Sequence, residues 1–255
     1  MSILVDSLSF SYCTRGVLEN VSFCAENGEL IAVMGPNGVG KTTLFNCVLG
    51  LLPRCKGQIE IDGENAKKLG ARELAKRLAS IPQSRPPVFG YTALEMTLMG
   101  TAHTLSIFGA PRKAQEDIAM DALERAGAAG LAHKNYAHLS GGEQQLVMIA
   151  RALAQNSANL LMDEPASGLD YGNQSRIMKR VRALADSGSC VVLSTHDPQH
   201  ALWYADKALV LKKGTAVAFG SPESVLTPAL LSDVYGVDVR FVRTDTGSVV
   251  MPLVK

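Results

Sequence analysis

Residues 35–43, with the sequence GPNGVGKTT, constrain the fold of this chain more than any other segment. They match the pattern G-x-x-x-x-G-K-[ST], in which backbone N–H groups wrap phosphates and the lysine reaches the β- and γ-phosphates. The apolar run 30–34 precedes this loop, and a helical pattern with Leu44, Val48 and Leu49 follows it. This order of strand, loop and helix predicts a phosphate site on an α/β fold with a mostly parallel sheet. The residues expected to surround the phosphates are Gly35, Pro36, Asn37, Gly38, Val39, Gly40, Lys41, Thr42 and Thr43, of which Thr42 also supplies a hydroxyl to Mg²⁺.

A second apolar run, residues 158–162, ends in Asp163, Glu164 and Pro165. Two adjacent carboxylates at the carboxyl end of a buried parallel strand are costly to place without a cation, which indicates Mg²⁺. We therefore expect Asp163 on the metal side, through water, and Glu164 as the group that polarises the attacking water. A strand end with solvated acids is the alternative, and the neighbouring phosphate loop makes it the weaker one.

Three further polar residues stand where contacts to a γ-phosphate would be expected. Gln83 follows the strand pattern 79–82, His196 follows the β run 190–195, and Asp170 closes the loop 166–170. Open α/β sheets build their sites at the carboxyl ends of strands. Taken singly, each residue also has a structural interpretation: a loop amide, a core or capping histidine, and the cap of a helix over 171–187.

The stretch LSGGEQQ, residues 139–145, reads as the start of another helix. Ser140 and Glu143 have the spacing of a capping box, and apolar residues follow at helical spacing. Gly141 and Gly142 leave room for an anion near free N–H groups, but the stretch has no lysine to hold a phosphate firmly. It predicts either half of a phosphate site or an ordinary helix cap.

In this order, the phosphate loop, the strand-end Gln, L-S-G-G-E-Q-Q, the strand ending in D-E-P, the S-G-L-D loop and the strand-end His resemble the ATP-binding subunits of ABC transporters. The resemblance extends from about residue 3 to residue 220. It implies a head-to-tail homodimer in which each ATP lies between the phosphate loop of one copy and the L-S-G-G-E helix of the other. Residues 140–143 would then contact the nucleotide of the partner, with Ser140 and Gly142 on its γ-phosphate.

The same resemblance implies roles for the candidates. Glu164 would be the catalytic base, His196 would orient γ-phosphate and water, and Gln83 would link Mg²⁺ to a membrane partner. Asp170 joins this catalytic set, and Tyr12 matches the aromatic residue that stacks on adenine, although alone it is an alternating strand residue. One small departure is Ala166, where many relatives have Thr.

Length and composition agree with one composite domain or two close-packed ones, because 255 residues that are 47% hydrophobic bury a substantial core. The resemblance implies a single ABC ATPase domain. The resemblance divides it into a RecA-like core over 1–83 and 157–255, with an N-terminal antiparallel β subdomain, and a helical subdomain over 84–156 that docks on an integral membrane permease. The net charge of +1 gives no electrostatic case for nucleic acid. No apolar segment reaches the ~20 residues of a membrane span, and the start lacks a signal-peptide pattern. We expect a peripheral protein on the cytoplasmic face of the cell membrane.

Two segments narrow the resemblance to importers of iron-siderophore, haem and cobalamin, with some molybdate or tungstate relatives. They are residues 82–92 (PQSRPPVFGYT) and the tail from 220 to 239. Ordinary loop and terminal-helix sequences are the alternative. The apolar residues within 86–91 also predict an exposed docking patch. The sequence thus favours the ATP-hydrolysing subunit of a metal-chelate importer, which acts through a permease and indirectly a substrate-binding protein.

Two other classes compete with this interpretation. A soluble ABC-type ATPase of iron–sulphur cluster assembly also has one domain of this size. A chromosome-maintenance ATPase would carry a long coiled coil between the phosphate loop and L-S-G-G-E, and no sustained heptads are present.

Overall fold

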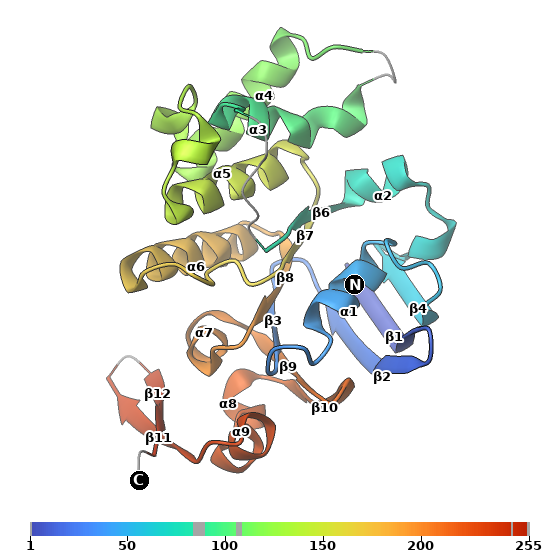
Figure 1. Ribbon diagram of the computed structural model, residues 1–255, viewed down its shortest axis with the longest axis vertical. Helices are drawn as coiled ribbons and strands as arrows, with labels where there is room; N and C mark the ends of the chain where they lie inside the picture. The colour runs from blue at the N-terminus through green and yellow to red at the C-terminus, as the bar shows by residue number, and fades with distance from the viewer. Residues whose placement is uncertain (1, 84–89, 106–108, 246, 254–255) are drawn as a thin grey trace.

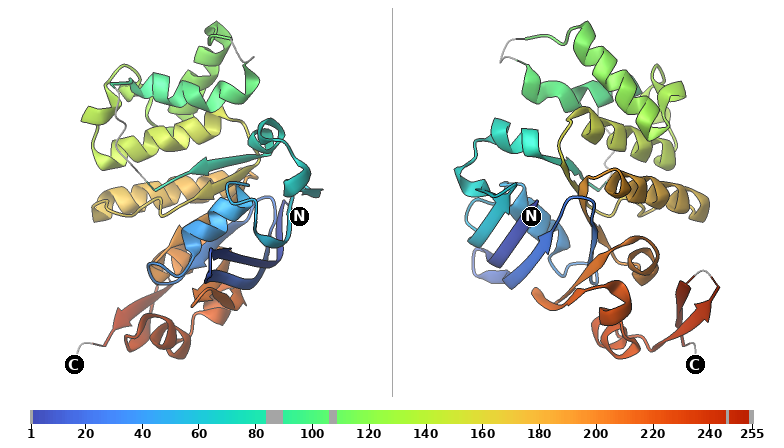
Figure 2. Two further views of the ribbon diagram at one scale, coloured as in Figure 1. Left: turned by 45° about the vertical axis from the view of Figure 1, so that its right-hand side comes forward. Right: turned by 180° about the vertical axis from the view of Figure 1, so that it is seen from behind.

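The computed structural model of the chain describes residues 2–83, 90–105, 109–245 and 247–253. Helices gather at one end, two β-sheets occupy the middle, and the C-terminal helices and a hairpin lie at the other end (Figure 1). The two views of Figure 2 likewise place the C-terminal hairpin far from the helical end. Within the described residues, no helix has the length and the apolar character needed to cross a membrane.

A six-stranded sheet with the order β10-β9-β3-β8-β7-β6 forms the centre of the molecule. All neighbouring pairs from β9 to β6 are parallel, and β10 is antiparallel to β9 at one edge. Every residue of β3, β7 and β8 is buried, which explains why these strands are mostly apolar in sequence. The strands are β3 (Leu30–Met34), β6 (Leu78–Ile81), β7 (Asn159–Met162), β8 (Cys190–Thr195), β9 (Lys207–Lys212) and β10 (Thr215–Gly220).

A second, antiparallel sheet has the order β2-β1-β4-β5. Its buried side chains, such as Ile3 and Val5, share one hydrophobic cluster with Leu44 of α1 and with Ile31 and Val192 of the central sheet. This sheet therefore covers one face of the central sheet together with α1. The strands of this sheet are β1 (Ile3–Tyr12), β2 (Arg15–Ala25), β4 (Lys56–Ile61) and β5 (Glu64–Asn65), and the helix beside it is α1 (Lys41–Val48).

Helices between β6 and β7 form the layer at the top of Figure 1. This confirms the predicted fold class: a mostly parallel core, an antiparallel β part and an inserted helical part. The helices are α3 (Ala93–Leu98), η2 (Met99–Thr104), α4 (Lys113–Ala126), η3 (Ala129–Leu131), η4 (Tyr136–His138) and α5 (Gly141–Ala154), while η1 (Ala66–Lys68) and α2 (Ala71–Arg77) precede β6. The predicted apolar patch is only partly observable, because residues 86–89 lie outside the described residues.

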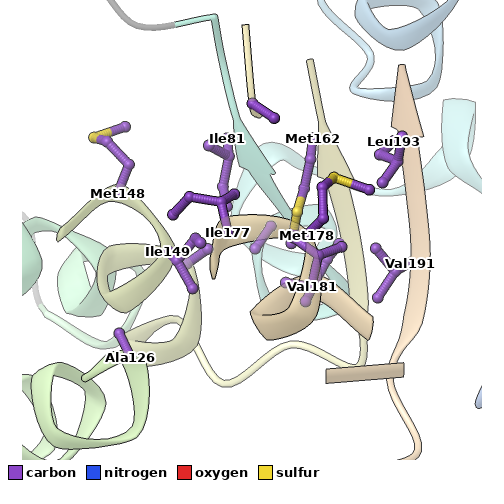
Figure 3. Packing of buried hydrophobic residues seen from close by; sticks show 14 of the residues in the cluster. Ile81, Ala126, Met148, Ile149, Met162, Ile177, Met178, Val181, Val191 and Leu193 are labelled. Atoms are coloured by element: carbon purple, nitrogen blue, oxygen red, sulfur yellow. The ribbon is translucent and has the colours of Figure 1, made fainter. Parts of the chain in front are cut away.

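Helix α6 (Tyr171–Asp186) joins the helical layer to the central sheet. Its buried residues Ile177, Met178 and Val181 lie against Met162 on one side and near Ile149 of α5 on the other (Figure 3). One continuous core therefore runs from the sheet into the helical layer. The domain division at 83/84 and 156/157 stays a prediction.

The C-terminal segment contains two short helices and a hairpin. Helices α8 (Pro222–Val225) and α9 (Pro228–Tyr235) are followed by an antiparallel hairpin of β11 (Val239–Thr244) and β12 (Gly247–Pro252). Gln199 of α7 (Pro198–Tyr204) donates to Ser248 O at 2.9 Å and accepts from Val250 N at 3.0 Å. These two bonds help to hold the hairpin to α7, because the side-chain amide of Gln199 pairs with two backbone groups of β12.

Candidate nucleotide site

The phosphate loop leaves β3 and enters α1 through glycines with positive φ, among them Gly35 at 146° and Gly40 at 115°. A Cβ on Gly35 would lie 2.5 Å from Leu211 O, and one on Gly40 would lie 2.9 Å from Leu18 Cδ2. Only glycine fits both positions. No side chain caps the start of α1. The first N–H groups of this helix are therefore left for an anion.

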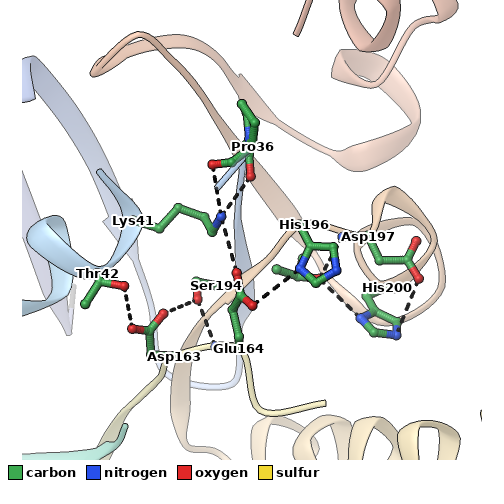
Figure 4. A network of polar contacts seen from close by, with 11 residues as sticks. Pro36, Lys41, Thr42, Asp163, Glu164, Ser194, His196, Asp197 and His200 are labelled. Atoms are coloured by element: carbon green, nitrogen blue, oxygen red, sulfur yellow. Dashed lines mark hydrogen bonds and ion pairs between the residues drawn. The ribbon is translucent and has the colours of Figure 1, made fainter. Parts of the chain in front are cut away.

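Lys41 lies under this loop, and 6% of its side chain is exposed. Its Nζ donates to Gly35 O at 2.8 Å and to Pro36 O at 3.3 Å. It also lies 3.4 Å from Glu164 Oε1 (Figure 4). The ammonium group thus has oxygen partners in the absence of a nucleotide, and a bound phosphate would have to replace some of them.

Asp163 is buried at the end of β7 and accepts two hydroxyl hydrogen bonds. Thr42 Oγ1 donates to its Oδ2 at 2.7 Å, and Ser194 Oγ donates to its Oδ1 at 2.5 Å. Ser194 also accepts from Glu164 N at 2.9 Å, so one serine of β8 bonds to the carboxylate of Asp163 and to the backbone of Glu164. Carboxylate and hydroxyl oxygens are the hard ligands that Mg²⁺ prefers, so Thr42 and Asp163 fit that ion beside bound phosphates.

Glu164 has a left-handed backbone, with φ of 48°. A non-glycine residue in this conformation carries strain of roughly 1–3 kcal/mol, which the surrounding structure must hold. Its carboxylate, 11% exposed, lies between Lys41 and His196, whose Nδ1 is 3.4 Å from Glu164 Oε2. The strained turn after β7 therefore places an acid between a cation and a histidine.

These groups surround a single cavity of about 380 Å³. Nine predicted residues meet there although they come from four separate segments of the chain: Asn37, Gly38, Gly40, Lys41, Thr42 and Thr43 of the phosphate loop and the start of α1, Gln83, Glu164 and His196. Its described lining is Val17, Asn37, Gly38, Gly40, Lys41, Thr42, Thr43, Gln83, Glu164, Ser167 and His196. A volume of this size is typical of a small-ligand site.

The remaining predicted residues do not belong to that described lining. Tyr12, at the end of β1, is 48% exposed, and its ring stands edge-on to Phe10 with centroids 4.8 Å apart. Asp170 is exposed and caps α6 by accepting from Asn173 N at 2.9 Å. Hydrogen bonds from the backbone and the side chain of Asn173 hold the pKa of Asp170 below its usual value.

Residues 140–143 form the predicted capping box at the start of α5. Ser140 N and Ser140 Oγ both donate to Glu143 Oε2 at 2.9 Å, and Glu143 N donates to Ser140 Oγ at 3.4 Å. The first two bonds lower the pKa of Glu143. A Cβ on Gly142 would lie 2.8 Å from Asn173 Cγ, and one on Gly141 would lie 3.2 Å from Leu169 Cδ2. The α5 start thus packs against the beginning of α6, away from the cavity of its own chain.

Comparison with known proteins decides the family. The model of the ABC transporter family matches residues 18–167. The chain belongs to the ABC transporter family. The hemin import ATP-binding protein HmuV of Hahella chejuensis is 40% identical over 233 residues, which cover 89% of each chain. The manganese transport ATP-binding protein MntB of Bacillus subtilis is 36% identical over 242 residues, 94% of each chain.

A solved structure of an ABC transporter described as of the metal-chelate type, in an inward-facing conformation, is also similar. Its chain has a TM-score of 0.88 and 30% identity, and the match covers 100% of this chain and 98% of that one. This ABC protein is therefore an ATP-binding subunit whose ATPase activity is coupled to transport. The iron–sulphur alternative receives no support from these relatives.

Three residues of this ABC ATPase site were not singled out from the sequence. Ser194 bonds to the Asp163 carboxylate and to the backbone of Glu164, Val17 of β2 lines the cavity, and His200 lies 3.2 Å from Thr195 Oγ1. The position of Ser194 could have been predicted from the sequence. On neighbouring parallel strands Leu193 pairs with Met162, so the residues that follow them, Ser194 and Asp163, lie side by side. The position of Val17 could not, because the contact of β2 with the loop is long-range.

Proposed function

We propose that this chain hydrolyses ATP as one half of a head-to-tail homodimer. The observation that carries the proposal is the division of its phosphate-binding groups. Lys41, Thr42, Glu164 and His196 line one cavity, whereas the glycine-bearing start of α5 lies outside the described lining. The lysine, the base and the start of α1 contact the phosphates from one side only. A site that encloses the phosphates needs a second group of N–H donors on the other side. The start of α5 in a second copy supplies these donors.

The residues of the chain divide the chemical work. Lys41 and the free N–H groups of α1 hold the phosphates, and Tyr12 is assigned to the adenine. Thr42 and Asp163, with Gln83 at the rim, would hold Mg²⁺, which when bound neutralises phosphate charge and keeps the transferring group in line. Glu164 accepts a proton from the attacking water, and His196 orients that water and the γ-phosphate.

Because Lys41 and Glu164 form an ion pair, phosphate binding comes before Glu164 can act as the base. At 3.4 Å the pair keeps the base next to the lysine. A phosphate that takes over Lys41 leaves Glu164 with His196 and free to face water. Binding and activation of the base are thereby linked, because the same lysine is the partner of both anions.

The transported material belongs to the metal-chelate class, with haem as the first candidate. Relatives with this printed role, hemin import proteins, reach 40% identity, and the similar solved structure is of the metal-chelate type. The chain then acts at the cytoplasmic face of the membrane, bound to a permease through its helical layer, and works indirectly with a substrate-binding protein that delivers the substrate to the permease. Manganese ion is a second candidate, because the MntB relative is 36% identical.

Deletion of the gene in its host tests the substrate. We expect the deletion strain to stop growing on haem as its iron source while it still grows on a simple ferric salt. A plasmid copy of the wild-type chain should restore growth, and Glu164→Gln should not. Normal growth on haem combined with a defect under manganese limitation would replace haem by manganese.

A further inference from the structure

The turn that carries His196 is held by side chains on both sides of it. Thr195 Oγ1 accepts a hydrogen bond from Asp197 N at 3.1 Å and lies 3.2 Å from His200 Nδ1. His200 Nε2 lies 3.7 Å from Asp197 Oδ2. One imidazole, on α7, thus reaches both the residue before His196 and the residue after it (Figure 4).

His196 itself depends on this turn for its orientation. Its side chain is 51% exposed, and its ring approaches Glu164 only to 3.4 Å. A long contact to one flexible carboxylate fixes a ring weakly, whereas the backbone on which the ring is mounted sets where it points. Whatever fixes residues 195–197 therefore fixes the position of His196 at the phosphate cavity.

The hydrogen-bond roles in the turn agree with a neutral His200. Thr195 Oγ1 already accepts from Asp197 N, so its own proton is free to be donated to His200 Nδ1. The proton of a neutral ring then lies on Nε2, which faces Asp197 Oδ2. Burial lowers the pKa of His200, and Asp197 opposes this only in part, so the ring stays neutral at pH 7.

The space beside the turn makes this support necessary. A cavity of about 100 Å³ lies there, with Glu164, Ser194, His196 and His200 among its lining residues. If the imidazole is replaced by a side chain that makes no polar contact, the turn loses its bonds and gains room to move. Movement of the turn displaces His196 from Glu164.

We propose that His200 is a positioning residue for ATP hydrolysis, which holds the turn of residues 195–197 so that His196 faces Glu164. This inference rests on the proposed role of His196. The groups that hold the nucleotide are separate, since Lys41 and Thr42 of α1 bond to the loop carbonyls and to Asp163. Loss of His200 should therefore lower kcat and leave KM for ATP almost unchanged.

Steady-state ATPase measurements on the full chain test this split. His200→Leu should lower kcat about 10-fold, within the roughly 100-fold that a misplacement of ~1 Å costs, and should change KM by less than about twofold. His200→Asn keeps an oxygen that accepts from Thr195 and should recover most of the rate. Equal losses in the Leu and Asn variants, or a raised KM with unchanged kcat, would overturn the proposal.

A double-mutant comparison separates this proposal from the role of His196. In a His196→Ala background, His200→Leu should lower kcat by less than about twofold, because there is no ring left to position. An undiminished loss in that background would overturn the role of His200. A wild-type rate for His196→Ala alone would instead overturn the proposed role of His196.

Gln199→Ala is the matched control on the same helix. It removes the two bonds of Gln199 to the C-terminal hairpin and leaves the side chains of Thr195 and Asp197 in place. It should lower the melting temperature and leave kcat near the wild-type value. If it lowers kcat as much as His200→Leu at an equal loss of melting temperature, His200 merely stabilises α7.

Discussion

Two glycine-bearing helix starts, those of α1 and α5, are built in opposite ways. α1 begins after Gly40 in a left-handed conformation, has no side-chain cap, and places Lys41 at its first position. α5 begins after Ser140, and its capping box uses the N–H groups of Ser140 and Glu143. α1 is therefore an unfinished helix start that a ligand completes, whereas α5 is a finished one.

The side chains around the two helix starts also differ: those at α1 are groups that can bind and hydrolyse a phosphoanhydride, and those at α5 are not. Around α1 lie a cation, two acids and a histidine, joined by contacts of 2.7 to 3.4 Å. Next to α5 lie Asn173 and Asp170, which bond to each other at 2.6 Å. The chemistry is thus concentrated at α1. The start of α5 offers the N–H groups of Gly141 and Gly142, which its capping box does not use. In the proposed dimer they face a nucleotide held by the other copy.

The largest effect should follow from Glu164→Gln at the α1 side. Loss of the base should lower the rate of ATP hydrolysis about 10³-fold. ATP affinity should be kept or increased, because Lys41 loses a competing carboxylate. ATPase assays and fluorescent-nucleotide titrations measure the two quantities.

Glu143→Gln is the matched change at the α5 side. Gln also completes a capping box, so stability and hydrolysis should change little. A variant of Glu164 that keeps the wild-type rate, or a collapse of activity in Glu143→Gln alone, would remove the contrast between the two helix starts.

Mixed dimers should show a smaller but more specific effect. Lys41→Ala and Ser140→Arg are each expected to be inactive alone. In a dimer of one Lys41→Ala chain and one Ser140→Arg chain, one site carries both changes and the other carries neither. Equal mixing should therefore restore about one quarter of wild-type activity, because about half of the dimers are mixed. ATPase rates across mixing ratios measure this. Activity that stays at the level of the single variants would show that each chain completes its own site.

The sequence was sufficient for both helix starts and for much of the fold. The bounds of β3 and β8 match the runs 30–34 and 190–195 seen in the sequence, because a strand buried on both faces is largely apolar. The capping roles of Ser140 and Asp170 are local and follow from spacing alone. The assignment of contacts across the dimer came from the resemblance and stays a prediction.

What the sequence did not reveal depends on distant contacts. The hairpin β11–β12 is held by Gln199 and Trp203, whose Nε1 donates to Ser248 O at 3.2 Å, and no local pattern announces such a pairing. His200 follows the strand-end histidine by four residues, but its contact with Thr195 exists only because α7 turns back over the end of β8. The strain at Glu164 likewise arises from tertiary contacts.

Alanine at one glycine of each start compares their steric tolerance. Gly35→Ala brings a Cβ within 2.5 Å of the backbone oxygen of Leu211 at a φ of 146°, and should lower the free energy of unfolding by more than about 2 kcal/mol. Gly142→Ala meets the side chain of Asn173, which can move, and gains helix propensity. Gly142→Ala should therefore lower the free energy of unfolding by less than about 1 kcal/mol. In an Asn173→Ala background it should cause no decrease. Urea unfolding without nucleotide measures all three variants, and equal losses at the two glycines would contradict the comparison.

The smallest effect concerns pH and the histidine behind the α1 side. Since burial lowers the pKa of His200 in the folded chain, the unfolded chain takes up this proton first as the pH falls below the ordinary value of about 6.5. Wild-type stability should then decrease between about pH 7 and pH 5 more than that of His200→Asn, and the difference should be absent above pH 7. His138→Asn, which removes an exposed histidine just before α5, is the matched control and should follow the wild type. Urea midpoints across this pH range measure the difference. If His200→Asn also follows the wild type, protonation of His200 costs the folded chain nothing, and the ring is not held neutral by its burial.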